Sequence, residues 1–442
     1  MYQRPGHPAT PSTAAPAPGG AALSADPGPG SVTAAGVADA VAARLARGDA
    51  ARARTVVSDL VRHTPVLTSR SLGETCGGRI LLKAENLQRT GSFKLRGALT
   101  KLASLGDAQG VVAGSAGNHA QSLAYAARHR GLACEVFMPQ EASVSKVAAV
   151  RGFGGTVRLG GDSVDGCVQL ARERAAETGA AFVHPFDDPD IIVGQGTLGL
   201  ELLEDVPDLA TVVIPLGGGG LTSGVAGVIK ARRPEVRVIG VQAGACAAYP
   251  ASLAAHEARE APAVPTIADG VAIKRPGGIT LPLVERWVDE VVVVDDDDVA
   301  EAMVFLLERA KLVVEGAGAV GVAALASGAI KPAERGATVI VLSGGNVDGG
   351  LLAAVAQRHE TSEGRRLRLF TRIPDRPGGL AKLLTLIAAE GGNLVTVEHV
   401  REAVSLHVRQ TGVALVLQTR GAEHAEQIVD VLGGAGYEVE RY

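Results

Sequence analysis

The sequence predicts an α/β protein with mainly parallel sheets, followed by a small C-terminal domain of the ferredoxin-like type. The first indication is a series of nearly continuous apolar runs, which suit strands buried on both faces. The second is that these runs alternate with Ala-rich helical stretches such as "NHAQSLAYAARHRG" and "DGCVQLARERAAETG", a pattern typical of parallel sheets. The third is a change after residue 366 to the order strand–helix–strand–strand–helix–strand, which indicates a ferredoxin-like unit.

The apolar runs of the first part are its expected strands. Several of them end in glycine-rich turns, and ligands of such folds bind at the carboxyl ends of strands. The expected strands cover residues 79–85, 110–115, 134–139, 155–161, 181–186, 211–218, 236–243, 290–296 and 337–345. The C-terminal part is expected to contain strands at 367–373, 393–400, 412–419 and 437–441, with helices at 378–390 and 422–433.

The composition also predicts where the domains end. Residues 1–35 are rich in Ala, Pro and Gly and have almost no large apolar side chains, so they bury too little surface to offset their ordering entropy and are expected to be disordered. The charged segment "RHETSEGRRLR" indicates a linker at residues 358–366. We therefore expect one domain at 36–357 and a second at 367–442.

Charge and cysteine content exclude several classes of protein. The formal net charge is -4 and the pI is near 6.2, and no basic patch dominates, which argues against nucleic acid as a partner. Four scattered cysteines without a CxxC pair indicate neither a disulfide framework nor a zinc site, and favour a reducing cytoplasm. No uninterrupted apolar run reaches about 18 residues, so no membrane span is expected.

A glycine loop is the first candidate for chemistry. Gly217, Gly218, Gly219 and Gly220 follow an apolar strand, and a helix is expected to start near Leu221. Converging backbone N–H groups and the helix N-terminus favour an anion such as phosphate. The loop matches neither GxxxxGK[ST] nor GxGxxG with an acidic residue about 20 positions later. A tight strand–helix connection without a ligand is the alternative.

Three further segments carry candidate residues. In "TGSFKLRGA", Lys94 is either a solvated charge at a helix end or a reactive amine, and Arg96 is expected to serve structure. In "GSAGNHAQ", Ser115 and Asn118 could receive a ligand carboxylate or could simply cap a helix, while His119 by itself suits a structural role. In "LSGGN", Ser343 follows an apolar strand.

Together, "TGSFKLRGA", "SAGNHAQ", "PLGGGGL" and "LSGGN" resemble the signature segments of the pyridoxal-phosphate β-family, or fold type II. Within it, the sequence is most similar to the threonine ammonia-lyases, also called threonine dehydratases, over about residues 50–357. The resemblance implies a catalytic unit of two subdomains, the smaller at about 87–188. The segment "TRIPDRPGGLAKLLTLIAAEGGNL" resembles an ACT domain, a small amino-acid-sensing module.

The resemblance implies a role for each matched residue. Lys94, preceded by Phe93, matches the lysine that binds pyridoxal phosphate covalently and later acts as the base. Asn118 matches the partner of the ring hydroxyl, and Ser343 the residue that faces the pyridine nitrogen. The phosphate is expected on Gly217, Gly218, Gly219, Gly220 and Leu221, and the substrate carboxylate on Ser115, Gly117, Asn118 and His119.

The implied reaction is β-elimination of L-threonine, and of L-serine, to 2-oxobutanoate or pyruvate and ammonia. A lysine that is near cations and partly desolvated would have the lowered pKa that this base needs. A hydroxyl at Ser343, in place of a carboxylate, favours elimination over transamination. A serine racemase or dehydratase, a threonine synthase and a non-catalytic amino-acid-binding homologue are the alternatives.

At two places this sequence differs from relatives of the family, and these differences help to distinguish the alternative functions. Ala116 stands where serine racemases of this family carry a second serine, so racemisation is expected to be poor. Gln242 and Ala248 stand where some relatives bind a divalent cation through Glu and Asp, so no such metal site is expected.

The C-terminal domain invites a regulatory interpretation. A loop that leads into a helix N-terminus contains Asp375, Pro377, Gly378 and Gly379. It is a candidate binding site for an amino-acid effector such as isoleucine or valine. A dimerisation module without a ligand is the alternative. The resemblance also implies a homo-oligomer, either a dimer or a tetramer, and a biosynthetic or a catabolic role.

Overall fold

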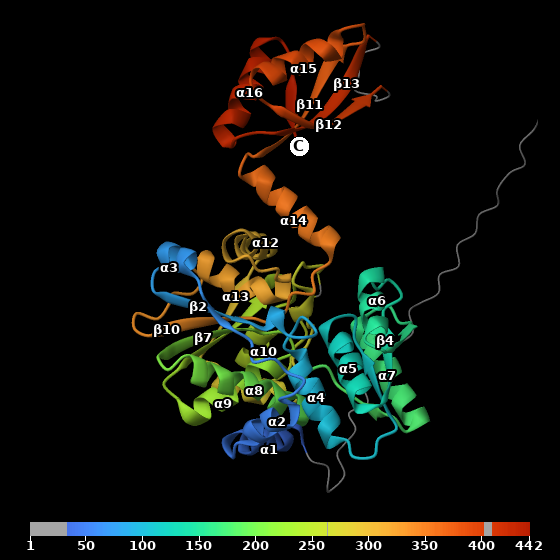
Figure 1. Cartoon of the computed structure of the whole chain (residues 1–442), viewed down its shortest axis with the longest axis vertical. Coiled ribbons are helices and arrows are strands. Elements are labelled where there is room, and N and C mark those ends of the chain that lie inside the picture. Colours follow the sequence, from blue (N-terminus) through green and yellow to red (C-terminus); the bar gives the residue numbers. More distant parts are fainter. Residues whose placement is uncertain (1–32, 263, 402–408) are drawn as a thin grey trace, which may run out of the picture. The chain divides into compact units, whose positions relative to one another are not determined.

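The computed structural model describes residues 33–262, 264–401 and 409–442, and it confirms the α/β class (Figure 1). Most of the tail predicted at residues 1–35 lies outside these ranges, and helix α1 begins at Ala34. The described chain contains two sheets in its first part, one mainly and one wholly parallel, and one antiparallel sheet in its C-terminal part.

The larger parallel sheet has six strands in the order β1-β2-β10-β7-β8-β9. All neighbours run parallel except β1, which pairs antiparallel with β2. The strands are β1 (Val66–Thr68), β2 (Arg79–Ala84), β7 (Leu209–Pro215), β8 (Arg237–Ala243), β9 (Glu290–Val294) and β10 (Ala337–Leu342). Every strand of this sheet except β1 was predicted from its apolar run.

Helices cover both faces of this sheet. In β2, Leu81 packs with α8 and α9, whereas Ile80 and Leu82 pack with α3, α12 and α13 on the other face; α1, α2 and α11 pack outside α8 and α9. These helices are α1 (Ala34–Ala46), α2 (Asp49–Val57), α3 (Arg70–Cys76), α8 (Pro189–Asp205), α9 (Gly220–Arg232), α11 (Thr280–Trp287), α12 (Asp296–Phe305) and α13 (Gly316–Ala326). Burial on both faces explains why the strands are apolar throughout.

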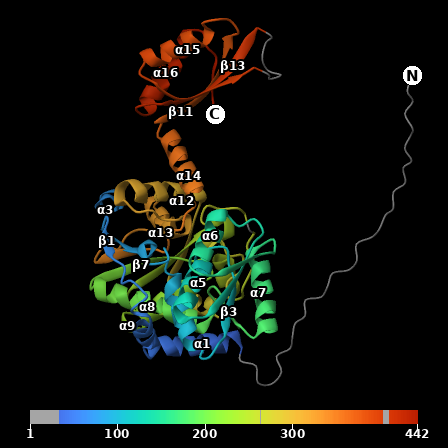
Figure 2. The same cartoon turned by 45° about the vertical axis from the view of Figure 1, so that its right-hand side comes forward.

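The smaller sheet is wholly parallel, in the order β5-β4-β3-β6. Figure 2 shows α5 and α7 on opposite sides of β3. Helices α4, α5 and α6 share a hydrophobic core with one face of the sheet, and α7 covers the other. The elements are β3 (Gly110–Gly114), β4 (Ala133–Met138), β5 (Thr156–Leu159), β6 (Ala181–Phe182), α4 (Lys94–Ser104), α5 (Asn118–Arg130), α6 (Val144–Gly152) and α7 (Val164–Thr178).

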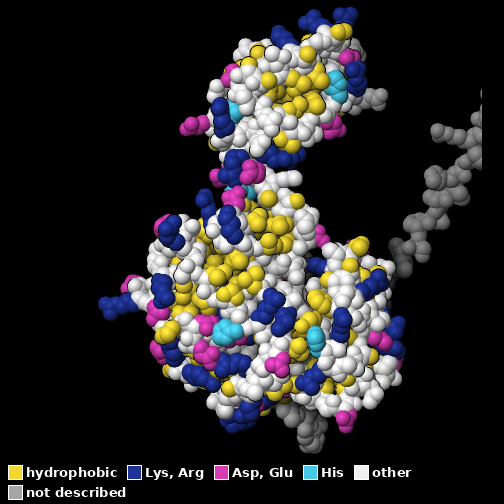
Figure 3. Space-filling view, viewed as in Figure 1, with side chains coloured by type: hydrophobic (Ala, Val, Ile, Leu, Met, Phe, Trp, Pro, Cys, Tyr) yellow, Lys and Arg dark blue, Asp and Glu magenta, His cyan; other side chains and the backbone are white. Residues whose placement is uncertain are grey.

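The C-terminal domain has the predicted βαββαβ order. Its antiparallel sheet runs β12-β13-β11-β14, and both helices share a hydrophobic core with it. Figure 3 shows hydrophobic side chains gathered on one face of this domain, and the edge strand β12 exposes Leu394, Val395 and Val397. The elements are β11 (Arg366–Pro374), α15 (Gly379–Ala389), β12 (Asn393–Val400), β13 (Gln410–Gln418), α16 (Ala422–Gly434) and β14 (Val439–Arg441).

The segment expected as a linker at residues 358–366 is largely helical. Helix α14 (Gly349–Ser362) continues through its first half, and β11 begins at Arg366. The charged residues break the apolar pattern but not the helix, and two of them contact α12: Arg358 lies 2.7 Å from Asp297, and His359 lies 2.6 Å from Glu301. The remaining short elements are α10 (Tyr249–Ala255), the 3₁₀ helices Glu85–Leu87, Gly244–Cys246 and Asp269–Val271, and a π-helical turn at Leu306–Ala310.

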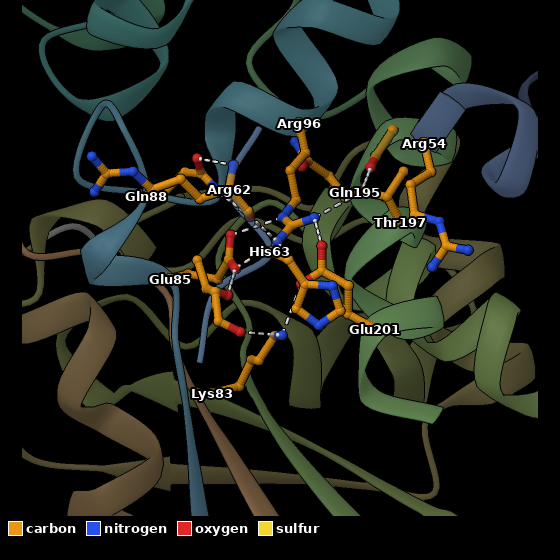
Figure 4. A network of polar contacts seen from close by, with 12 residues as sticks. Arg54, Arg62, His63, Lys83, Glu85, Gln88, Arg96, Gln195, Thr197 and Glu201 are labelled. Carbon is orange, nitrogen blue, oxygen red and sulfur yellow. Dashed lines mark hydrogen bonds and ion pairs between the residues drawn. The ribbon is translucent and has the colours of Figure 1, made fainter. Parts of the chain in front are cut away.

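A buried ion network joins the start of α4 to the large sheet (Figure 4). The guanidinium of Arg96 donates to Glu85 Oε1 and Oε2, both at 2.8 Å, and to Glu201 Oε1 and Oε2 at 2.6 and 2.9 Å. The Nζ of Lys83 contacts Glu201 Oε2 at 2.7 Å, and all four side chains are at most 3% exposed. Burial opposes ionisation of Glu85, but Arg96 outweighs it and lowers the pKa of that carboxyl. Arg96 therefore has the structural role expected from the sequence.

Replacing Arg96 should destabilise the protein strongly. Arg96→Met leaves Glu85 and Glu201 buried beside a single cation, and breaking a buried pair in this way costs roughly 3–5 kcal/mol. Arg54→Met is the matched control, because Arg54 pairs with Glu204 at the surface, where an ion pair contributes about 1 kcal/mol or less. Urea denaturation followed by circular dichroism would measure both. Equal midpoints for the two variants would contradict the role given to the network.

Candidate active site

One cavity of about 590 Å³ collects the residues of all the segments predicted in the first domain. It lies at the carboxyl ends of parallel strands, as expected for such folds: Ser115 follows β3, the glycine loop follows β7, and Ser343 follows β10. The predicted residues that line it are Phe93, Lys94, Ser115, Gly117, Asn118, His119, Gly217, Gly218, Gly219, Gly220, Leu221 and Ser343. The effector candidates Asp375, Pro377, Gly378 and Gly379 do not line it; they lie in the C-terminal domain, where the first three follow β11 and Gly379 begins α15.

Backbone pairing with the loop after β10 places Lys94 at the first turn of α4. The Phe93 N–H donates to Ser343 O at 3.1 Å, and the Gly345 N–H donates to Gly91 O at 2.9 Å. Gly91 has a φ of +72°, and a Cβ on it would overlap the amide of Asn346. Glycine is therefore required at this turn for both its conformation and its close approach.

The amine of Lys94 donates to the carbonyl oxygen of Pro185 at 2.8 Å. Desolvation lowers the pKa of Lys94 to about 8, and the carboxylate of Glu315 acts in the opposite direction. Of the two causes expected for the lowered pKa of Lys94, desolvation is present, because an ammonium loses hydration in the protein interior, whereas no nearby cation among the described residues contributes.

The glycine loop ends in a helix N-terminus that faces the cavity. Gly219 has a φ of +91° and immediately precedes α9, whose first N–H groups lack intrahelical acceptors. The carbonyl of Gly218 accepts from Thr280 Oγ1 at 2.7 Å and from the Tyr249 hydroxyl at 3.2 Å, which fixes the direction of that peptide. A Cβ on Gly218 would overlap the ring of Phe186. The loop therefore offers a rigid anion site.

The amide of Asn118 is held in one orientation by two partners. Its Nδ2 donates to Glu315 Oε1 at 2.6 Å, and its Oδ1 accepts from Asn346 Nδ2 at 2.7 Å. The second N–H of the amide is left for a ligand. At the start of the same loop, Ser115 Oγ accepts from the Gly117 N–H at 3.3 Å.

Glu315 lines the cavity and was not predicted from the sequence. Its side chain is buried; burial and the neighbouring Asp269 raise its pKa to about 7, and the bond from Asn118 lowers it. A lone carboxylate in the apolar stretch "LVVEGAGAVGVAALA" was the available signal. Asn346, also missed, is the last residue of the "LSGGN" segment that was singled out for Ser343.

His119 and Ser343 are both buried in the wall of the cavity. His119 Nε2 lies 3.1 Å from Val183 O; burial, followed by the charge of Lys94, lowers the pKa of His119 to about 3, so the ring stays neutral. The other ring nitrogen, Nδ1, is buried and has no hydrogen-bonding partner among the described residues. Ser343 Oγ donates a long bond of 3.5 Å to Ala317 O.

The two residues at the position considered for a metal are not carboxylates in this chain. Gln242 Oε1 accepts from the Tyr249 N–H at 2.9 Å, and Ala248 is buried. Within residues 33–262, 264–401 and 409–442, no three His, Cys, Asp or Glu side chains are grouped to hold a metal ion. In the same part of the chain, no helix combines the length and the apolar character needed to cross a bilayer.

Comparison with known proteins indicates the same family as the signature segments of the sequence. Residues 57–344 match the family described as pyridoxal-phosphate dependent enzyme. The chain is 45% identical to L-threonine ammonia-lyase of Thermotoga maritima over 88% of its own length and 98% of that protein. It is 42% identical to the catabolic L-threonine dehydratase of Escherichia coli K12 over 69% and 94%. The Thermotoga match is too long to fit within residues 1–344 and therefore includes part of the C-terminal domain.

Solved structures resemble the same part of the chain. The T.th. threonine deaminase aligns with a TM-score of 0.64 and 41% identity, over 68% of this chain and 98% of that one. Maize serine racemase aligns with a TM-score of 0.67 and 36% identity, over 71% and 98%. With a family match over more than half its length, this chain belongs to the pyridoxal-phosphate dependent enzymes.

Proposed function

We propose that this enzyme deaminates L-threonine by β-elimination, with L-serine as a second substrate, and releases 2-oxobutanoate or pyruvate together with ammonia. The observation that carries the proposal is the single cavity in which the Lys94 amine, the glycine loop and the clamped amide of Asn118 meet. The names of the relatives that match most of the chain support the same reaction.

The residues of the cavity fit pyridoxal phosphate, the cofactor of the family. Lys94 supplies a primary amine, and the rigid loop Gly217–Leu221 supplies N–H groups for the phosphate. Asn118 would donate its free N–H to the ring hydroxyl, with Phe93 beside Lys94 and Ser343 facing the ring nitrogen. The cofactor, when bound, supplies the electron sink for cleavage at Cα.

The chain's own residues bind the substrate and move the proton. The loop formed by Ser115, Gly117, Asn118 and His119 receives the carboxylate, since its small residues and the start of α5 expose backbone N–H groups. Lys94, whose pKa is about 8, is neutral in roughly a tenth of the molecules at pH 7, far more than an ordinary lysine, and takes the Cα proton. Ala116, which carries no hydroxyl, offers no base on the opposite face and so disfavours racemisation.

We also propose that residues 36–357 form the catalytic domain, with a smaller subdomain at about 87–188, and that residues 367–442 form an ACT domain that senses isoleucine or valine. The βαββαβ order supports this, as does the loop at Gly378, whose φ of +84° opens the N-terminus of α15. Arg401 pairs with Asp375 at the same loop, at 3.4 Å. A homo-oligomer located in the cytoplasm completes the proposal.

Substrate assays test the reaction directly. Wild-type enzyme should form 2-oxobutanoate from L-threonine and pyruvate from L-serine, measured by a coupled dehydrogenase assay. Lys94→Ala should abolish both products, because it removes the base, whereas Lys331→Ala, at an exposed position, should retain them. Absence of both products with the wild type would refute the proposed function.

The pKa of Lys94 predicts how the apoprotein takes up its cofactor. Only the neutral amine reacts, so the rate of pyridoxal phosphate capture should rise with pH around a midpoint near 8, instead of the ordinary 10.5 of a lysine. Glu315→Gln removes the carboxylate that raises this pKa and should therefore move the midpoint below that of the wild type. Stopped-flow absorbance would follow the capture; a midpoint near 10.5 would contradict the desolvation of Lys94.

Regulation can be tested in the loop before α15. Isoleucine or valine should change the rate of the wild type with threonine. Gly379→Ala should remove this response and leave the basal rate, because its Cβ would lie 2.7 Å from Pro374 O and displace the loop. Gly433→Ala, where the Cβ meets open space, is the control. A wild type that responds to neither amino acid would favour the dimerisation module.

A further inference from the structure

His184, which the sequence did not single out, lies in the wall of the catalytic cavity. It follows β6, and β6 pairs with β3, whose end carries the loop at residues 115–119. The next residue, Pro185, accepts the hydrogen bond from Lys94. The imidazole is therefore close to both the proposed carboxylate loop and the proposed base, since its charge would act on His119 and the charge of Lys94 acts on it.

The hydrogen bonds of His184 assign its tautomer. Its Nδ1 accepts from the N–H groups of Asp187 at 2.8 Å and Phe186 at 3.3 Å. Because Nδ1 is an acceptor, the proton of the neutral ring lies on Nε2. Burial, followed by the charges of Arg172 and Lys94, lowers the pKa of His184 to about 3, so the ring is a neutral donor near pH 7.

Two aromatic side chains fix the plane of the ring. Phe186 meets His184 edge to face, with ring centroids 4.6 Å apart and an interplanar angle of 86°. Phe182 meets it at 6.0 Å and 74°. Within the described residues the Nε2 of His184 has no hydrogen-bonding partner, so a donor of fixed direction remains available in the cavity wall.

We propose that His184 donates a hydrogen bond from Nε2 to the β-hydroxyl oxygen of the substrate and so selects amino acids that carry this hydroxyl. This inference rests on the proposed elimination of a β-hydroxy amino acid. The carboxylate is received by the loop at residues 115–119, and Lys94 acts at Cα. The β-hydroxyl oxygen lies on the carbon next to Cα and gains negative charge as its bond to carbon breaks, so a donor aimed at it would assist the elimination.

Two substitutions separate the donor from the structural role of Nδ1. In His184→Asn, the side-chain oxygen can replace Nδ1 as acceptor for Phe186 and Asp187, while the Nε2 donor is lost. In His184→Gln, the amide can replace the Nε2 donor, while the acceptor for the turn is lost. The turn supports the glycine loop, since a Cβ on Gly220 would lie 2.8 Å from Phe186 O.

The experiment compares L-threonine with L-2-aminobutanoate, which lacks only the hydroxyl. In His184→Asn, kcat/KM for threonine should fall by roughly 5- to 100-fold, as expected for an unpaired polar group. The inhibition constant of 2-aminobutanoate and the absorbance of the bound cofactor should stay as in the wild type. His184→Gln should keep the preference for threonine over 2-aminobutanoate but retain the cofactor less tightly.

The following results would overturn the inference. An unchanged kcat/KM in His184→Asn would show that the hydroxyl has another partner, and equal weakening of both ligands would place the contact at the carboxylate. If His184→Asn does not fold, loss of the preference in His184→Gln overturns it. Failure of the proposed function is recognised separately, by a wild type that forms no 2-oxo acid; the two ligands can then still be compared through the cofactor absorbance.

Discussion

The buried pairing of Arg96 with Glu85 and Glu201 is the constraint on which the rest of the site depends. Desolvating these charges is costly, and an ion pair in such a place rarely adds stability over apolar packing. Its value here is positional, because it joins the end of β2, the first turn of α4 and the middle of α8. Lys94 lies two residues before Arg96 on the same turn. The network therefore also fixes the backbone position from which the Lys94 side chain extends.

The same network prevents its own buried carboxylates from raising the pKa of Lys94. Arg96 and Lys83 contact the buried carboxylates Glu85 and Glu201, and Lys83 also contacts Asp205 at 3.0 Å. Both buried carboxylates therefore have a cationic partner of their own and are not left to attract the Lys94 ammonium. Desolvation then lowers the pKa of Lys94, with only Glu315 opposing it. An unpaired carboxylate at either position would favour the charged lysine and weaken it as a base.

The fold was more predictable than the site because strands and helices leave local patterns in the sequence and contacts across the fold do not. The strands β2, β7, β8 and β10 are continuous apolar runs, whereas the three residues of β1 are too few to show a pattern. The run at 181–186 was expected as one strand, but pairing ends at Phe182 and the chain then turns to bring His184 and Pro185 to the cavity.

The predicted site residues lie in segments that contain glycine, most of them directly after a strand, where several signals coincide; Lys94 instead begins α4. Glu315 and Asn346 hold Asn118 from 197 and 228 residues away, and no local pattern encodes such contacts. The helical part of the segment at 358–366 was not predicted for a related reason: its charged residues look like a break in the pattern, and their contacts are with α12, far back in the sequence.

The pKa values of Glu315 and Lys94 are close to each other. Coupling between the two groups therefore makes the neutral fraction of the Lys94 amine in the apoprotein less sensitive to pH. Burial and Asp269 raise the pKa of Glu315 to about 7, just below the value of about 8 for Lys94. As the pH falls through 7, Glu315 becomes neutral and no longer stabilises the ammonium, so the pKa of Lys94 falls as well. The neutral fraction of Lys94 therefore declines less steeply than for an isolated amine. His119 and His184, both neutral in this range, add no charge that would disturb this balance.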